Sequence, residues 1–196
     1  MKKDFSTVDI TKLTPKEKIF ELVKEGARPG DMCETLPGYI HEKELEDIST
    51  QLGLTVKELK ENFLREVRAY NTTLHRPKHE AVERRLGFKP TDTIHQLPYG
   101  KCIFLDKATK PGEHKCMLGG SKPLHCKIAS DGAHSEKLHA WYLLNHAVNP
   151  NDKLSLREWA IYLKTHPTIP GGELHELIDD PSKLDAFFEN DAHHDD

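Results

Sequence analysis

The side chains best suited to chemistry in this 196-residue sequence are four cysteines, Cys33, Cys102, Cys116 and Cys126. The intervals between successive cysteines contain 68, 13 and 9 residues, so three are close in sequence and one comes from far upstream. Each lies in or beside a segment with glycine or proline, and such segments can bend around a common centre. The spacing therefore predicts a site built by loops, in which four thiolates hold one metal ion or cluster.

A structural interpretation of the same residues stays open. Cys102 and Cys116 could face inward on neighbouring strands as small apolar side chains, which is common for cysteines outside disulfides. The sequence has no C-x2-C pair typical of zinc ribbons, no C-x2-C-H sequence for haem attachment and no ferredoxin-type cysteine run. The intervals therefore do not select one metal.

Two histidines stand close to the cysteines in sequence. His125 adjoins Cys126, and His114 lies two residues before Cys116. Either could replace a cysteine as a ligand or donate a hydrogen bond to one. The sequence has 13 histidines, and we expect most of them to lie on the surface.

A family resemblance rests on three segments: 102–106 (Cys-Ile-Phe-Leu-Asp), Cys116, and 122–127 (Lys-Pro-Leu-His-Cys-Lys). They resemble the second half of the YkgJ family, whose pattern runs C-P-F-L-D and then C-x-I-Y-x-x-R-P-x-x-C-R. The nine-residue interval and the proline three positions before the last cysteine both match. Cys33, with 37–40 (Pro-Gly-Tyr-Ile) after it and an acidic helix beyond, resembles the first half.

YkgJ proteins are described as zinc- or iron-chelating cysteine-cluster domains, so the resemblance implies that the four cysteines hold a metal or cluster. The sequence departs from the family in two respects. Cys33 stands alone where relatives carry several cysteines, and Lys122 and Lys127 replace two arginines. The chain can therefore hold at most one complete four-sulfur site.

The same set of four cysteine ligands is compatible with two functions. An iron–sulfur cluster on four thiolates can carry one electron, which would suit a protein of redox chemistry or metal handling with an electron-transfer partner. A zinc ion with four cysteine ligands is coordinatively closed and would stabilise a helical module that binds a protein partner. We favour iron–sulfur or iron, with zinc as the alternative.

Enzymatic motifs are missing from the sequence. It contains no H-E-x-x-H, no G-x-S-x-G, no Walker A loop and no C-x3-C-x2-C sequence. We therefore expect a binding protein rather than an enzyme acting by itself.

Charge and hydropathy exclude two classes of partner. The formal net charge is -4, which provides no attraction for the phosphates of nucleic acids. The apolar stretch 140–148 is too short to span a bilayer, and the opening 1–7 lacks the apolar core of a secretion signal. We expect no nucleic-acid or membrane partner and a cytoplasmic location.

Capping residues and apolar periodicity predict a mainly α fold, with short helices around the cysteine site and at most one small β-hairpin. We expect the hairpin to pair 102–105 with 115–118, and most of 71–100 to be ordered loop. The expected domains are a metal-binding domain over 1–130, a helical extension over 131–190 and a disordered tail over 191–196. The expected helices are 15–25, 41–52, 55–70, 135–148, 155–165 and 182–189.

Overall fold

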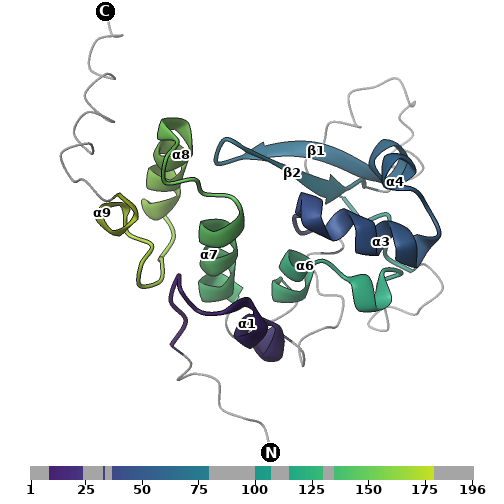
Figure 1. Ribbon diagram of the computed structural model, residues 1–196, viewed down its shortest axis with the longest axis horizontal. Coiled ribbons are helices and arrows are strands. Elements are labelled where there is room, and N and C mark those ends of the chain that lie inside the picture. The colour runs from purple at the N-terminus through teal and green to yellow at the C-terminus, as the bar shows by residue number, and fades with distance from the viewer. Residues whose placement is uncertain are drawn as a thin grey trace, which may run out of the picture. The chain divides into compact units, whose positions relative to one another are not determined.

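Short helices dominate the structure, a computed structural model that describes residues 9–23, 33, 37–79, 100–106, 115–129 and 135–178 (Figure 1). In chain order the elements are α1 (Lys16–Val23), the 3-10 helix η2 (Glu42–Glu44), α3 (Leu45–Leu52), α4 (Val56–Phe63), β1 (Leu64–Ala69), β2 (Thr72–Pro77), the 3-10 helix η4 (Gly119–Ser121), α6 (Leu124–Ile128), α7 (Ser135–His146), α8 (Lys153–Leu163) and α9 (Leu174–Leu177). Strands β1 and β2 form one two-stranded sheet. The prediction of a mainly α fold with a small hairpin is confirmed.

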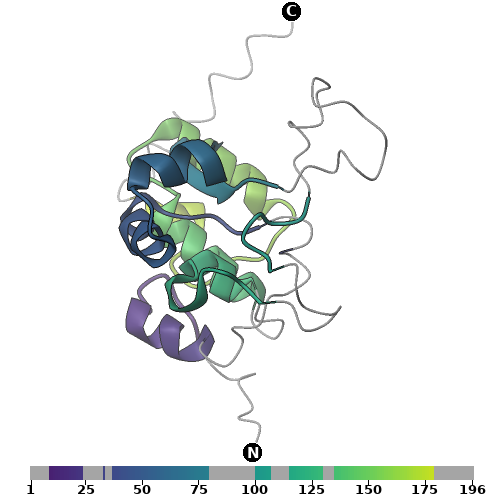
Figure 2. The same ribbon diagram turned by 90° about the vertical axis from the view of Figure 1, so that its right-hand side faces the viewer.

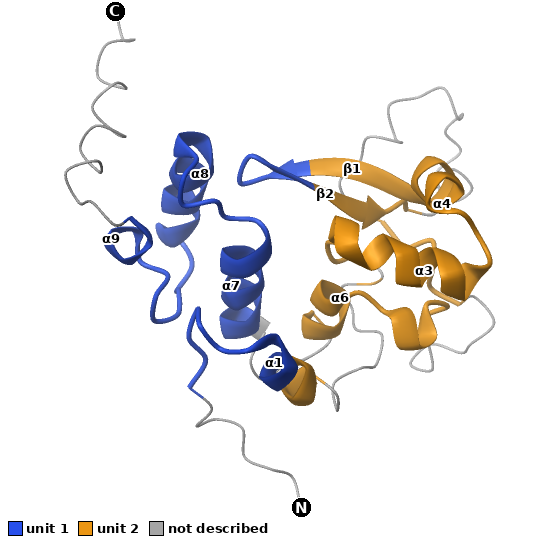
Figure 3. Ribbon diagram, in the orientation of Figure 1, with its two compact units in different colours: residues 1–19, 68–73, 133–196 blue, residues 20–67, 74–132 orange. Residues whose placement is uncertain are grey.

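The chain divides into two compact units (Figure 3). Residues 20–67 and 74–132 form the first, called the cysteine unit here because it contains all four cysteines. Residues 1–19, 68–73 and 133–196 form the second. Residues 1–19 and the hairpin tip thus fall in the same unit as 133–196. The tail 191–196 lies outside the described residues.

Helices α3 and α4 lie side by side in the cysteine unit (Figures 1 and 2). Gly53 ends α3 in the left-handed conformation, with φ 66°, which glycine adopts without steric cost. Thr55 then begins α4, since its hydroxyl accepts from the Glu58 N–H at 3.2 Å while the Glu58 carboxylate accepts from the Thr55 N–H at 2.8 Å. Both signals were predicted, and the structure confirms them.

The predicted helix 55–70 is wrong in its second half. The structure ends α4 at Phe63 and continues as β1, where half-buried and exposed residues alternate after Leu64. Tyr70 and Asn71 have φ of 53° and 54°, which forms the tight two-residue turn of a hairpin. Residues 72–77, predicted as loop, form β2 instead. The helix was predicted because apolar residues from Val56 to Tyr70 recur at intervals of three and four. Within β1 the burial instead alternates with the two-residue period of a strand.

The hairpin predicted over 102–118 forms only in part. Leu105 and Cys116 make an isolated antiparallel bridge, and the Met117 N–H donates to the Phe104 carbonyl at 2.8 Å. Cys102 makes a second isolated bridge with His79. The regular hairpin of this protein is β1–β2 instead.

The core of the cysteine unit gathers side chains from all of these segments. Its buried members are Ile40, Leu45, Ile48, Leu59, Leu64, Cys102, Phe104, Leu105 and Leu118. Cys33 and Cys116 are partly buried and pack against this cluster. Three of the four cysteines therefore belong to the apolar core or border it.

The second unit packs around two tryptophans. Trp159 is fully buried and donates from Nε1 to the Gly172 carbonyl at 2.8 Å, and Trp141 donates to the Thr14 carbonyl at 2.9 Å. Helix α8 begins two residues before the predicted start, because Asp152 rather than Ser155 is its N-cap. The predicted helix 182–189 lies outside the described residues.

Among the helices of the described residues, none combines the length and the apolar character that crossing a bilayer requires.

Candidate metal centre

Backbone contacts bring three of the cysteine segments together. The Cys102 N–H donates to the Cys33 carbonyl at 2.7 Å, although 68 residues separate them in sequence. The bridge between Leu105 and Cys116 then joins the segment of Cys102 to that of Cys116. The segments that carry Cys33, Cys102 and Cys116 therefore contact one another, although Cys33 is remote from the others in sequence.

Electrostatic interactions link Cys126 to the other three cysteines. Burial raises the pKa of its thiol well above the usual value, and the charges of Cys102, Cys33 and Cys116 raise that pKa further. Each of these three sulfurs is therefore close enough to Cys126 to affect its ionisation. Burial also raises the pKa of the Cys116 thiol.

The thiols are near one another without already forming a coordination sphere. None of the four cysteines is in a disulfide. Within the described parts of the chain, no three or more His, Cys, Asp or Glu side chains stand in a geometry ready to hold a metal ion. The four sulfurs would therefore have to draw together to coordinate one.

Regular structure carries the cysteines more than the predicted loops do. Cys126 lies in α6, Cys33 has helical backbone, and Cys102 and Cys116 are bridge residues. The prediction of a site built only by loops is therefore wrong. A short helix and paired extended segments hold the thiols more firmly than unpaired loops would.

A buried lysine accompanies the thiols. Lys122 is only 5% exposed, and its positive charge lowers the pKa of both Cys116 and Cys126. Burying an ammonium is costly unless negative charge lies nearby. Sequence analysis noted Lys122 only as a replacement for an arginine, because nothing in the local sequence reveals its burial.

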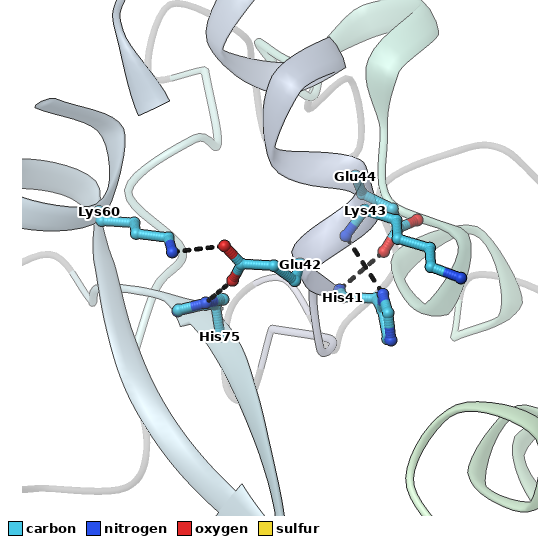
Figure 4. A network of polar contacts seen from close by, with 6 residues as sticks. All are labelled: His41, Glu42, Lys43, Glu44, Lys60 and His75. Carbon is cyan, nitrogen blue, oxygen red and sulfur yellow. Dashed lines mark hydrogen bonds and ion pairs between the residues drawn. The ribbon is translucent and has the colours of Figure 1, made fainter. Parts of the chain in front are cut away.

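Glu44 fixes the start of the helix that carries Cys126. Its carboxylate accepts from the Leu124 N–H at 2.8 Å and from the His41 N–H at 2.9 Å. Figure 4 shows Glu44 beside His41 at the beginning of the η2 segment. The carboxylate thus satisfies an amide at the first turn of α6 and ties that turn to η2.

The neighbouring Glu42 ties η2 to α4 and β2. It lies between Lys60, whose Nζ is 2.5 Å from Oε1, and His75, whose Nε2 is 2.8 Å from Oε2 (Figure 4). The hydrogen bonds from Lys60 and then His75 lower the pKa of Glu42. These contacts anchor the segment that precedes α3.

His125 has a structural contact that bears on its predicted role as a substitute ligand. It is 2% exposed, its Nδ1 accepts from the Tyr39 N–H at 2.8 Å, and its ring stacks on Tyr39 with centroids 5.1 Å apart. A neutral imidazole that accepts at Nδ1 carries its proton on Nε2 and has no lone pair left for a metal. This arrangement favours a structural role. His114, the other predicted substitute, lies outside the described residues.

We expect His125→Ala to lower stability and leave the metal content of the protein unchanged. The variant deprives the Tyr39 N–H of its acceptor in a buried environment, which costs about 1–3 kcal/mol. Urea unfolding and metal analysis of the same samples check both parts. His175→Ala, at an exposed position of α9, is the control and should change neither quantity. Loss of metal from a folded His125→Ala protein would instead make His125 a ligand.

Gly38 is a second residue of the site that sequence analysis did not single out. A Cβ atom there would lie 2.9 Å from the Cys126 nitrogen and 3.0 Å from both Cys126 Sγ and His125 Nδ1. Only a residue without a side chain allows the 37–39 segment to approach α6 this closely. The segment 37–40 appeared in the sequence only as part of the resemblance to the YkgJ family, because the close approach of Gly38 to α6 depends on the tertiary fold.

We therefore expect Gly38→Ala to destabilise the protein by about 1–3 kcal/mol, because the added methyl group displaces backbone and sulfur together. Chemical denaturation measures the change. Gly120→Ala is the matched control, since a Cβ atom there meets no atom within 4 Å. Equal stabilities of the two variants would contradict the close approach.

Comparison with known proteins gave no match: no family model, no curated protein and no solved structure matches this chain.

Proposed function

We propose that the protein binds one metal centre through Cys33, Cys102, Cys116 and Cys126 and acts in redox chemistry or metal handling. The observation that carries this proposal is the convergence of the cysteines: the Cys102 N–H donates to the Cys33 carbonyl at 2.7 Å, and burial and then the charges of Cys102, Cys33 and Cys116 raise the pKa of the Cys126 thiol. Thiolates this close repel one another, whereas a metal ion bound between them compensates their charge.

The four cysteines are better suited to binding one metal together than to remaining independent thiols. Burial and mutual repulsion raise the pKa of Cys126, so its thiol stays protonated in the absence of a cation. A thiophilic metal displaces those protons and converts mutual repulsion of the thiolates into shared attraction to one ion. A divalent ion compensates half of the charge of four thiolates, and Lys122 compensates half of what remains.

Iron–sulfur or iron is the centre we favour. Cys126 and Cys102 are buried, whereas Cys33 and Cys116 are half-buried and reach toward the surface. A cluster on these ligands would be shielded on one side and would have a short path for an electron on the other. This function implies a protein partner for electron transfer and a reducing compartment such as the cytoplasm.

A structural zinc is the second candidate, and the core of the unit favours it. Cys102 belongs to the apolar cluster, with Cys33 and Cys116 packed against it. A closed zinc site at this position would contribute folding free energy directly to a unit of short helices, and the module would then serve as a scaffold for a protein partner.

The same cysteine positions carry the resemblance to the YkgJ family, and we propose a distant relationship to it. The proline before Leu124 and the nine-residue interval before Cys126 are the features that support it.

Anaerobic purification of the untagged chain followed by iron, zinc and sulfide analysis tests the proposal. We expect visible charge-transfer absorption and iron; a colourless protein with one zinc per chain would select the second candidate. A His193→Ala/His194→Ala variant removes a histidine pair that can bind metal adventitiously. We expect this variant to retain its metal, because the proposed ligands are the cysteines. A chain that binds neither metal after reconstitution would overturn the proposal.

A further inference from the structure

We propose that Arg65 and Arg76, on the face of the β1–β2 hairpin that also carries Tyr39, form a binding site for a phosphate group. The inference is independent of the metal centre, because the site contains none of the cysteines. It rests on the register of the strands, the surroundings of Arg76 and the charge of the two guanidinium groups.

The register places the two arginines side by side. The turn at Tyr70 and Asn71, together with the hydrogen bond from the Lys78 N–H to the Phe63 carbonyl at 2.8 Å, sets the pairing of β1 with β2. In that pairing Arg65 lies directly opposite Arg76, so both side chains share one face of the sheet. Like charges in this position destabilise a hairpin.

A third residue extends the row. Ile40 forms an antiparallel bridge with His75 on the other edge of β2, which places Tyr39 opposite Arg76. The Arg76 Cζ lies 4.0 Å from the centroid of the Tyr39 ring, a close cation–π contact. The Tyr39 ring also stacks on the ring of His125, so a ring that is itself held in place positions the guanidinium of Arg76.

The guanidinium of Arg76 has an N–H donor that no acceptor in the described part of the chain satisfies. Its Nε is buried and meets no hydrogen-bond acceptor in the described part of the chain, and no carboxylate of that part forms an ion pair with it. Burial and then the charge of Arg76 lower the pKa of Arg65, which shows that the two cations repel each other. An anion bound at Arg76 reduces the repulsion between the two like charges.

The chemistry of the pair indicates a phosphate group. The guanidinium of Arg76 offers forked donors, and Arg65 adds a second positive charge beside it, which together match the geometry and the charge of a phosphate dianion. The Tyr39 ring already contacts both His125 and Arg76, so these partners would compete with a nucleobase for stacking on it. The ligand is therefore inorganic phosphate or the phosphate of a small monoester.

Calorimetric titration of the full chain with inorganic phosphate and, in a second arm, glycerol phosphate tests the site at constant ionic strength in chloride. We expect saturable binding that weakens about tenfold or more in Arg76→Gln and in Arg65→Gln. Arg68→Gln is the matched control, because Arg68 lies on the other face of β1 and hydrogen-bonds Asn71. The arm that binds more tightly identifies the source of the phosphate.

Three results would overturn the proposal: no saturable binding in either arm, equal binding by the wild type and Arg76→Gln, or equal weakening by Arg68→Gln. Thermal unfolding of each variant without phosphate verifies that it is folded. Arg76→Lys adds a further check, because it keeps the charge and loses the fork, and its affinity should fall between those of the wild type and Arg76→Gln. Metal content should be unchanged in all of these variants, which separates this site from the proposed metal centre.

Discussion

Cys126→Ala is expected to abolish the metal centre, reducing the content from one centre per chain to none. Cys126 is one of the two buried cysteines, and its ionisation reflects all three others. Three thiolates cannot complete a tetrahedral site. Because metal binding contributes to the free energy of folding, removing one ligand also lowers the stability of the protein. We expect the stability that metal adds to the wild type, several kcal/mol, to vanish in the variant.

Ile128→Ala is the control for nonspecific destabilisation. Ile128 lies two residues further along α6 and is 1% exposed, so its truncation should cost about 2–5 kcal/mol through the cavity that it leaves. It removes no sulfur and should keep the full metal content. Metal analysis and thermal unfolding with and without added metal compare the two variants. If Cys126→Ala retained a full centre, Cys126 would not be a ligand.

Lys122→Met is expected to shift metal binding to higher pH. The ammonium lowers the pKa of Cys116 and Cys126, so its removal raises both values. Protons compete with the metal for these sulfurs, and a higher thiol pKa therefore means that half-loading occurs at higher pH. At neutral pH we expect affinity to fall about 10–100-fold, the usual effect of removing a group that supports metal ligands.

Titration with Co²⁺ across a pH series measures this shift through the thiolate charge-transfer band. Lys127→Met is the matched control, since Lys127 lies in α6 next to Cys126 but is half-exposed, with its Nζ 5.3 Å from the centroid of the Phe20 ring. It should leave the pH of half-loading in place. A shift of the same size in both variants would show that net charge, rather than the position of Lys122, controls binding.

Local signals in the sequence were sufficient for part of the fold. Gly53 and the Thr55–Glu58 capping box mark the junction of α3 and α4, because the interactions involved span only three or four residues. The stripe from Val56 to Tyr70 failed because an apolar spacing of three or four also occurs in a helix followed by a strand. The turn at Tyr70 and Asn71 contains no glycine, so its usual signal was missing.

The candidate site, like the fold, could be predicted from the sequence only in part. The residue types and intervals of the cysteines predicted that four thiolates hold one metal or cluster, and the structure adds a backbone hydrogen bond between Cys102 and Cys33. The burial of Lys122 and the close approach of Gly38 to Cys126 could not be predicted, because each is a contact between segments remote in sequence. Whether the sulfurs hold a metal stays a prediction.

The order of the segments along the chain has a consequence for biosynthesis. Every residue of the cysteine unit, 20–67 and 74–132, is translated before residues 133–196. Residues 1–19 and 68–73 must wait for that last stretch, since they belong to its unit. The segments that carry the four cysteines can therefore pack together while the nascent chain is still attached and the last stretch is still being translated.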